Sequence, residues 1–292
     1  MAVHVRRATR RWEPTSVLRG TIGEAREILS SGSVVVLTGA GMSTDSGVPD
    51  YRGPRAAEAT PMLYDEFVGD EANRRRYWAR NYIGWSRAVL SGPNEGHRAL
   101  ATWESTGRPG RLVGVVSQNV DGLHEAAGST RLVTLHGRGA DVVCLDCRHL
   151  SSRGALQERL TALNPHVDMS LPMGHAELRP DMDADVRDWA DFVVPECEAC
   201  GGMLKPDVVF FGEPVPKERV HTAMAWCDAA DAMLVVGSSL TVMSGFRFPR
   251  LMHKHGKPIV IVNHGATRAD ELATVRLDTG VSGFLVDLVG QD

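Results

Sequence analysis

Residues 33–53 read SVVVLTGAGMSTDSGVPDYRG, an apolar run followed by a turn rich in glycine and hydroxyl side chains. The run Val34–Leu37 is mostly β-branched, which predicts a strand buried on both faces. Gly39-Ala40-Gly41 comes directly after it, and glycines at a strand end allow a ligand close to the backbone, where free N–H groups favour a phosphate. The stretch therefore predicts a nucleotide or phosphate loop, with a turn that binds nothing as the competing interpretation.

Polar residues continue this loop. Ser43 to Ser46 offer hydroxyl groups and a possible helix N-cap, and Asp50, Tyr51 and Arg52 form a charged turn. The dinucleotide fingerprint GxGxxG fails because Thr44 stands in the place of its third glycine. No strand ending in an acid follows about 20 residues later. The loop is thus not of the ordinary dehydrogenase kind.

Strand and helix patterns alternate along most of the chain. Helices are predicted at Thr21–Ser30, at Pro93–Thr106 with Asn94 as N-cap, at Lys217–Ala230 and through Leu251 and His255. Further strands are predicted at Leu112–Ser117, Arg131–Leu135, Asp207–Phe211, Met233–Val236 and Pro258–Val262. Repetition of strand, polar loop and helix predicts an α/β fold with a Rossmann-like parallel sheet whose loops converge on one edge.

Polar groups follow several of these strands. They are Gln118, Asn119 and Asp121, then His136, then Gly237-Ser238-Ser239, and finally Asn263-His264-Gly265. Open α/β sheets bind ligands beyond the carboxyl ends of their strands. These residues are therefore candidates for a site, although a histidine at a strand end is by itself more often structural.

Two CxxC pairs, Cys144/Cys147 and Cys197/Cys200, bracket 49 residues that prolines interrupt. Each pair can present two thiolates to one tetrahedral zinc ion, and disulfides are the competing interpretation. Four thiolates leave no coordination position for water, so the metal would be structural. Cys227 is expected to be buried and inert.

A second segment, Tyr64–Leu90, is rich in arginine and aromatic residues and is predicted to be helical and outside the sheet. Its Trp78, Tyr82 and Trp85 either pack in a core or line a pocket. The domain prediction places the parallel sheet in residues 20–54, 91–136 and 205–292. The helical module (55–90) and the zinc-binding module (137–204) form a smaller discontinuous domain, and residues 1–19 form a basic arm.

Composition narrows the functional classes. Hydrophobic residues make up 43% and charged residues 23% of the 292 residues, which describes an ordinary globular chain. A net charge of −4 argues against a general nucleic-acid binder, and no apolar run approaches the roughly 18 residues of a membrane helix. The arginine-rich start permits a mitochondrial targeting segment, but a cytoplasmic protein is the preferred interpretation.

The stretch GAGMSTDSGVPDYRG resembles the signature loop of the sirtuins, the NAD-dependent protein lysine deacylases. Gln118–Asp121 is similar to the nicotinamide-ribose motif of that family, and Leu135-His136-Gly137 to its catalytic histidine motif. Lys205–Glu213 resembles the clamp on the acyl-lysine backbone. The resemblance covers roughly residues 20 to 290. The stretch RRYWARNYIGW and the long cysteine insertion further resemble the class II branch, with its mitochondrial-type members and bacterial relatives.

The resemblance implies two cofactors, NAD and zinc, and acylated lysine side chains of proteins as the substrate. His136 would act as general base on a ribose hydroxyl, a role suited to an imidazole that titrates near neutral pH, and Asn119 would orient water or the ribose. The implied NAD contacts are Gly39, Ala40, Gly41, Ser43, Asp50, Tyr51, Arg52, Gln118, Asn119, Asp121, Gly237, Ser238, Ser239, Asn263, His264, Gly265 and Val281. Val208, Val209, Phe210 and Phe211 would hold the substrate. The zinc ligands would be Cys144, Cys147, Cys197 and Cys200.

One departure concerns the acyl group. Family members that remove succinyl groups carry a Tyr-x-x-Arg pair, and Asn81 and Gly84 stand in those places here, so a strong preference for succinyl or malonyl groups is not expected. A protein mono-ADP-ribosyltransferase that uses the same NAD site is the alternative function. A catalytically silent NAD sensor is weaker, because His136 and Asn119 are both present.

Overall fold

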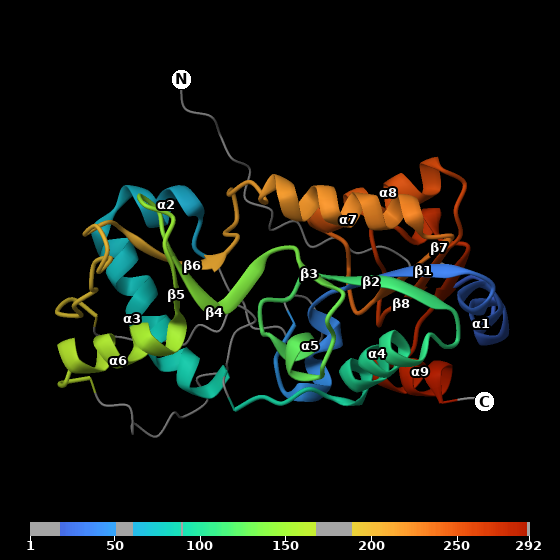
Figure 1. Ribbon diagram of the computed structural model, residues 1–292, viewed down its shortest axis with the longest axis horizontal. Helices are drawn as coiled ribbons and strands as arrows, with labels where there is room; N and C mark the ends of the chain where they lie inside the picture. The colour runs from blue at the N-terminus through green and yellow to red at the C-terminus, as the bar shows by residue number, and fades with distance from the viewer. Residues whose placement is uncertain (1–17, 51–60, 89, 168–188, 291–292) are drawn as a thin grey trace.

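The computed structural model describes residues 18–50, 61–88, 90–167 and 189–290. Within these residues, six strands form a parallel sheet in the order β3-β2-β1-β7-β8-β9, called the large sheet here. Three further strands form a small antiparallel sheet in the order β5-β4-β6. Figure 1 shows the two sheets side by side along the long axis of the molecule.

The large sheet consists of β1 (Ser33–Thr38), β2 (Arg111–Ser117), β3 (Leu132–Thr134), β7 (Ala232–Val236), β8 (Ile259–Val262) and β9 (Val275–Leu277). Its helices are α1 (Ile22–Ser30), α4 (Glu95–Thr106), α5 (Leu123–Ala126), α7 (Lys217–Ala229), α8 (Met243–Lys254) and α9 (Val281–Val289). We call this set the parallel-sheet unit. The predicted α/β class is confirmed, as is the N-cap that Asn94 provides to α4, and Thr21, predicted as the first helical residue, is the N-cap of α1.

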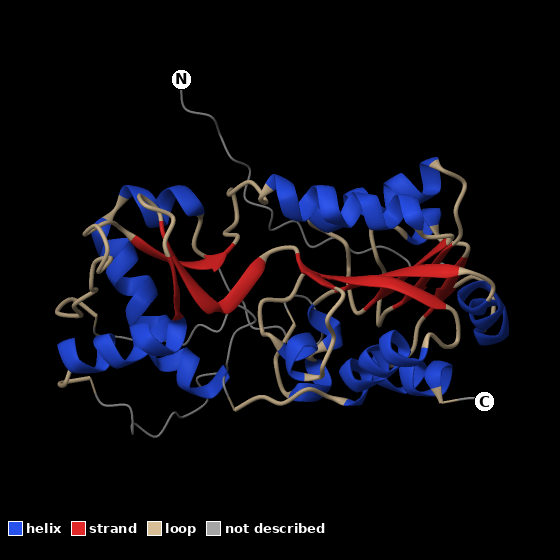
Figure 2. Ribbon diagram, viewed as in Figure 1, coloured by secondary structure: helices blue, strands red, loops and turns tan. Residues whose placement is uncertain are grey.

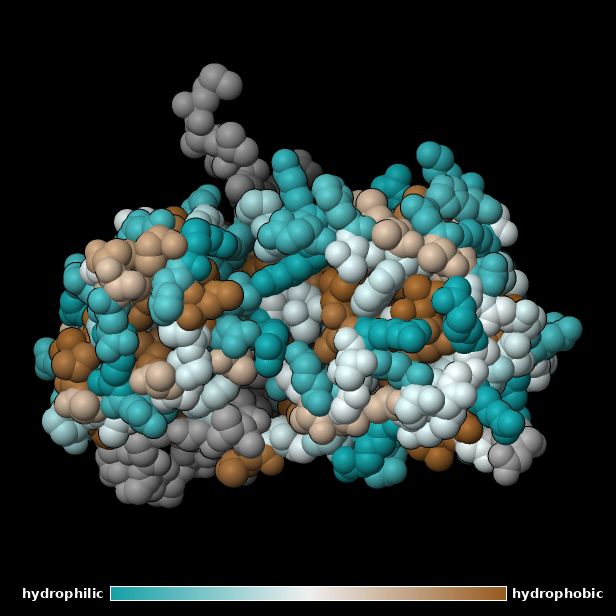
Figure 3. Space-filling model, in the orientation of Figure 1, coloured by the Kyte–Doolittle hydropathy of each residue, from teal (hydrophilic) through white to brown (hydrophobic). Residues whose placement is uncertain are grey.

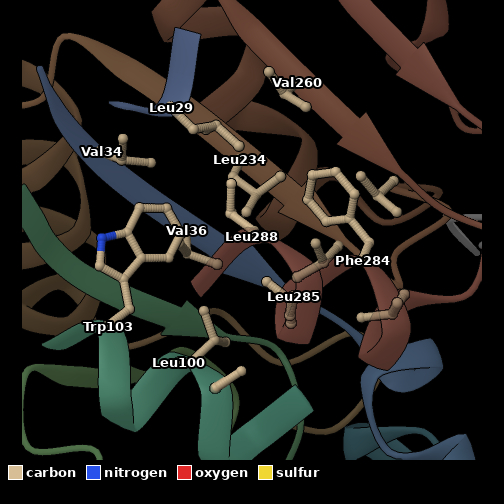
Figure 4. Packing of buried hydrophobic residues seen from close by; sticks show 14 of the residues in the cluster. Leu29, Val34, Val36, Leu100, Trp103, Leu234, Val260, Phe284, Leu285 and Leu288 are labelled. Atoms are coloured by element: carbon tan, nitrogen blue, oxygen red, sulfur yellow. The ribbon is translucent and has the colours of Figure 1, made fainter. Parts of the chain in front are cut away.

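Alternation along each strand explains why both faces of the large sheet are covered. Side chains of a strand point to opposite faces in turn. Val34 and Val36 accordingly pack with α1, α4 and α9, whereas Val35 and Leu37 pack with α7 and α8. Figure 4 shows the first of these cores, with Trp103 of α4 and Phe284 of α9 facing the strands. A strand buried on both faces reads as a continuous apolar run, which is why residues 34–37 identified β1.

The small sheet consists of β4 (Gly137–Cys144), β5 (Leu150–Ser152) and β6 (Leu204–Val208), and its helices are α2 (Tyr64–Gly69), α3 (Glu71–Ala88) and α6 (Arg153–Leu163). We call this set the cysteine unit. It has its own core, which is rich in aromatic rings: Phe67, Tyr77, Trp78, Tyr82, Phe192 and Phe210. Figure 2 shows its helices around the small sheet at the left of the view. Trp78 and Tyr82 are thus core residues, as the packing interpretation expected.

Two predictions about elements are wrong. The strand predicted at Asp207–Phe211 is Leu204–Val208, and it pairs antiparallel with β4 instead of joining the parallel sheet. Its apolar residues indicated a strand but carried no information about its partner, and β4 lies 60 residues or more away in sequence. The helix suggested after Ser43 is absent from the described residues, where two short 3-10 turns, Ala40–Met42 and Thr44–Ser46, occupy the segment.

Figure 3 shows a face on which hydrophobic residues lie in several separate groups among hydrophilic ones. Among the helices that the structure describes, none combines the length and the apolarity needed to cross a membrane.

Candidate active site

Strand register places the candidate residues at one edge of the large sheet. Thr38 is level with Ser117 on one side and Val236 on the other. Val236 is level with Val262, and Ser117 with Thr134. The loops that begin after these residues therefore start from a common line, as expected for a ligand site at the carboxyl edge of a parallel sheet.

The strand order reverses between β1 and β7, and the loops after these two strands touch. Gly41 N–H donates to the Gly237 carbonyl at 2.8 Å, and Gly39 N–H donates to the Val236 carbonyl at 3.2 Å. A Cβ on Gly39 would lie 2.7 Å from the Ser238 Cβ, and one on Gly41 would lie 2.9 Å from the Gly237 Cα. Both positions thus require glycine, because the two loops pack backbone against backbone.

The loop after β2 is bonded to the glycine loop. Asn119 Nδ2 donates to the Gly39 carbonyl at 3.0 Å and to Ser43 Oγ at 2.9 Å. The Ser43 hydroxyl in turn donates to Asp121 Oδ2 at 2.6 Å. Burial raises the pKa of the Asp121 carboxyl, and the bonds from Ser43 and Leu123 partly oppose that rise. The structure therefore brings Ser43, Asn119 and Asp121 into one network.

His136 follows β3 and is held at both ring nitrogens. Nδ1 lies 2.9 Å from the Gln118 carbonyl oxygen, and Nε2 lies 2.8 Å from Ser244 Oγ of α8. The pKa of His136 is lowered to about 4, chiefly by burial and to a lesser degree by the charges of Arg219 and Arg247, while the bond to Gln118 opposes the shift. The ring is thus neutral at pH 7, and its titration lies below the neutral range that the sequence suggested.

The clamp segment Val208–Phe211 lies where the two units meet. Val209 N–H donates to the His136 carbonyl at 2.8 Å, so the segment is attached directly to the histidine. Val208 to Phe211 line a small cavity of about 50 Å³ together with Pro61, Met62 and Tyr77. A Cβ on Gly137 would lie 1.8 Å from the Asp207 carbonyl oxygen, so the chain can pass this junction only with glycine after the histidine.

A buried ion pair braces the clamp segment. Lys205 Nζ lies 3.2 Å from Glu213 Oε2 and donates to the Val208 carbonyl at 2.6 Å. The same carboxylate accepts the Phe210 N–H at 2.9 Å. Burial lowers the pKa of the Lys205 ammonium, and Glu213 opposes that shift. Both side chains thus act on the backbone of the residues predicted to bind substrate.

The far end of the edge carries Asn263, His264 and Gly265 after β8. Asn263 Nδ2 donates to the His264 carbonyl at 2.7 Å and to the Gly265 carbonyl at 3.0 Å, which closes the loop on itself. Fully buried Arg276 donates to the Asn263 carbonyl at 3.1 Å and also to the Gly265 carbonyl. Val281, the first residue of α9, is buried in the core of the parallel-sheet unit. Tyr51 and Arg52 lie outside the described residues.

The four predicted metal ligands form one cluster. The Sγ atoms of Cys144, Cys147, Cys197 and Cys200 all lie within 4.8 Å of one another. The pairs Cys144–Cys200 and Cys147–Cys197 are 3.6 and 3.8 Å apart. Sulfurs around a tetrahedral zinc with Zn–S bonds of about 2.3 Å are separated by about 3.8 Å, so the cluster fits zinc. Cys227 lies apart and buried, where burial raises the pKa of its thiol to about 12.

Sequence reasoning did not select Ser244 or Arg276 for the site. Ser244 is the second residue of α8, six residues after Ser238, and nothing in that spacing indicates a bond to His136. Arg276 stands in a three-residue strand, and an isolated arginine in an apolar segment is the only signal that could have identified it.

The comparisons with known proteins agree with this geometry. A model of the Sir2 family matches residues 39–244. NAD-dependent protein deacetylase 1 of Mycobacterium avium (strain 104) is 48% identical over 277 residues, which is 93% of this chain and 97% of the relative. NAD-dependent protein deacetylase of Xanthomonas axonopodis pv. citri (strain 306) is 48% identical over 261 residues, which is 87% of this chain and 85% of the relative.

The solved structure of a Sir2 protein with a p53 peptide and NAD+ has a TM-score of 0.73 at 27% identity, and the match covers 93% of this chain and 98% of the other. The family predicted from the signature loop is confirmed on both sequence and structure. The chain belongs to the Sir2 family.

Proposed function

We propose that this chain is an NAD-dependent protein lysine deacetylase that converts an acetylated lysine to free lysine, with nicotinamide and O-acetyl-ADP-ribose as the other products. The single observation that carries the proposal is the junction at His136. There a half-buried, neutral imidazole is hydrogen-bonded to the backbone carbonyl of Gln118, and the backbone carbonyl of His136 accepts the Val209 N–H of the clamp segment.

NAD supplies an electrophilic ribose carbon, with nicotinamide as the leaving group. The glycine loop and the polar network of Ser43, Asn119 and Asp121 are suited to hold it, because glycines allow a ligand close to the backbone and polar side chains lie directly beside them. Asn119 uses its amide nitrogen for Gly39 and Ser43. Its amide oxygen is then the group that can accept a hydrogen bond from a ribose hydroxyl or from water.

His136 supplies the base. An imidazole with Nδ1 bonded to a carbonyl oxygen carries its proton there, so Nε2 presents a lone pair. Nε2 can therefore remove a proton from a hydroxyl, and a positioned base of this kind contributes about 10²–10⁴-fold to a rate. The apolar cavity beside the clamp is suited to the aliphatic stem of a lysine, with backbone groups of Val208–Phe211 along the peptide.

The proposal also covers the roles of individual site residues, the branch of the family, the preferred acyl group and the cellular location. The cofactor and substrate residues predicted above take the roles given there, and the arginine-rich helix α3 supports the class II branch. Asn81 accepts a hydrogen bond from the buried Arg153 at 2.8 Å, so it is committed within the cysteine unit. This supports a preference for neutral acyl groups over succinyl. The bacterial relatives favour a cytoplasmic location over the mitochondrial matrix.

The test is a pair of rates on wild type and His136→Ala. Wild type should release nicotinamide from NAD only when an acetyl-lysine peptide is present, and a panel of acyl peptides should rank neutral groups at least equal to succinyl. In the variant, deacetylation should fall by roughly 10²–10⁴-fold, while binding of NAD and peptide in calorimetry stays near wild type.

His253→Ala is the matched control, because His253 is exposed at the other end of α8. Near-normal acetyl release by His136→Ala would remove this histidine from the reaction. Transfer of ADP-ribose to a protein, with no acetyl release, would favour the mono-ADP-ribosyltransferase instead.

A further inference from the structure

Ser244 lies in the first turn of α8 and contacts the base nitrogen of His136. Its Oγ is 2.8 Å from Nε2, while Nδ1 is 2.9 Å from the Gln118 carbonyl oxygen. A carbonyl oxygen can only accept, so Nδ1 must carry the ring proton. Nε2 is then an acceptor, and the Ser244 hydroxyl donates to it. The base nitrogen is thus already hydrogen-bonded before any substrate hydroxyl arrives.

The two residues that hold the imidazole are packed against each other. Gly245 follows Ser244, and a Cβ on it would lie 2.3 Å from Gln118 Oε1. Helix α8 can therefore approach the Gln118 side chain only because this position is glycine. Gln118 Nε2 donates to Ser238 Oγ at 2.9 Å and to the Thr38 carbonyl at 3.1 Å, which fixes that side chain in turn. The bond between Ser244 and His136 is thus set by backbone packing and not by a mobile surface contact.

We propose that Ser244 is a positioning residue that stabilises His136 in both of its protonation states. This inference rests on the proposed function. In the resting enzyme the hydroxyl donates to neutral Nε2. The incoming ribose hydroxyl replaces it there and gives its proton to Nε2, keeping the electron pair on its own oxygen. The Ser244 hydroxyl then turns about its Cβ–Oγ bond and accepts from the new Nε2–H, because a hydroxyl is both a donor and an acceptor.

The charges around His136 explain why a neutral hydroxyl suits this task. Arg219 of α7, which is paired with Asp207 of β6 at 2.6 Å, and Arg247 of α8 both disfavour a protonated ring. Gln118, on the strand side, contributes only a neutral carbonyl. Ser244 can stabilise the imidazolium without adding an anion that would hold the proton permanently.

The experiment compares Ser244→Ala with Ser244→Thr, which keeps a hydroxyl, and with Ser105→Ala, a serine on the exposed face of α4. Because hydrogen bonds to charged groups are about twice as strong as neutral ones, losing Ser244 weakens the protonated ring more than the neutral one. The kcat of Ser244→Ala for deacetylation should fall roughly tenfold, or about 1.4 kcal/mol. The acid limb of kcat/KM should move to lower pH. KM for NAD and the rate of nicotinamide exchange should change much less, and Ser244→Thr should recover most of kcat.

Nitrogen-15 NMR of the ligand-free enzyme gives a second readout that needs no turnover. Wild type should show a neutral ring protonated at Nδ1, and Ser244→Ala should shift the Nε2 resonance alone. A ring protonated at Nε2 would overturn the inference, as would an active Ser244→Ala enzyme with wild-type kcat and an unmoved acid limb. A wild-type enzyme that releases no acetyl group would overturn the proposed function itself, which distinguishes the two failures.

Discussion

The two units of this protein reach a folded core by different means. The parallel-sheet unit packs aliphatic strands between helices on both faces, and its core residues come from six strands in register. The cysteine unit has a core rich in aromatic rings, and its buried Arg153 packs on two of its tryptophans, with the guanidinium 5.6 Å from the centre of the Trp78 ring and 5.2 Å from that of Trp85.

The difference between the two cores explains why the cysteine unit needs additional stabilisation. Among the described residues the cysteine unit has three strands against six, and its buried cluster contains fewer aliphatic side chains than those of the parallel-sheet unit. Small units of this kind are commonly completed by disulfides or metals. The cysteine cluster ties β4 to the segment before β6, and we infer that zinc there stabilises the cysteine unit while the parallel-sheet unit folds without it.

Loss of the metal should have the largest effect, and it should act on the cysteine unit alone. Cys197→Ala should lose zinc and unfold the cysteine unit, because structural zinc contributes about 10 kcal/mol or more in small zinc-finger peptides. Hydrogen exchange should become fast at Val142–Cys144 and stay slow at Val34–Val36. Cys227→Ala removes a buried cysteine outside the cluster and should keep one zinc per chain. Equal protection of both units in metal-free protein would contradict the division.

Two buried tryptophans, one in each unit, allow a matched test of whether the two units unfold separately. Trp78 and Trp103 are both fully buried, and their Nε1 groups donate to the carbonyls of Leu204 and Gly110 at 3.3 and 2.6 Å. Replacing either with alanine should cost about 3–5 kcal/mol. We expect Trp103→Ala to lower the free energy of global unfolding and Trp78→Ala to speed exchange only within the cysteine unit. If both variants lowered the protection of both units equally, the chain would unfold as a single cooperative body.

Acid should affect the parallel-sheet unit through a buried pair of histidines. His97 and His124 lie with ring centroids 4.8 Å apart, and His97 Nδ1 accepts the Asn94 N–H at 3.2 Å. Burial lowers the pKa of His97 to about 4, helped by Arg98, and that of His124 to about 3, helped by His97. Among the described residues, neither His97 Nε2 nor His124 Nδ1 has a hydrogen-bond partner. Both rings are therefore neutral in the folded protein.

The direction in which stability changes with pH follows from the difference between the folded and unfolded pKa values of these histidines. The unfolded chain protonates these histidines near pH 6.5, above the pH at which the folded protein does, so stability is full above about 6.5 and falls as the pH drops toward 4. The expected loss is a few kcal/mol, read from denaturant melts or from exchange at Val34–Val36. His97→Asn keeps an acceptor for Asn94 without a titrating ring, and should make the slope shallower. An unchanged slope in this variant would exclude His97 as a cause.

Much of the fold was predictable from local patterns. The apolar run at residues 34–37, the glycines after it and the paired cysteines each constrain the chain over a few residues, and the structure confirms the strand, the glycine turn and the cluster. The strand β4 was not predicted. Its sequence, GRGADVVC, carries glycines and charges, and pairing with β5 and β6 is what makes it a strand. The three-residue strand β9 is likewise defined by its pairing with β8.

By itself, the sequence determined the residue types of the site, because a glycine turn, a CxxC pair or a histidine after a strand is a local pattern with its own chemistry. Only the tertiary structure decided what those residues do to one another. The hydrogen-bond partner of His136 Nε2 is Ser244, 108 residues away in sequence. The pKa of His136 depends on burial by segments that meet only in the folded chain. Hydrogen-bond partners and desolvation are properties of packing between distant segments, so no local pattern can contain them.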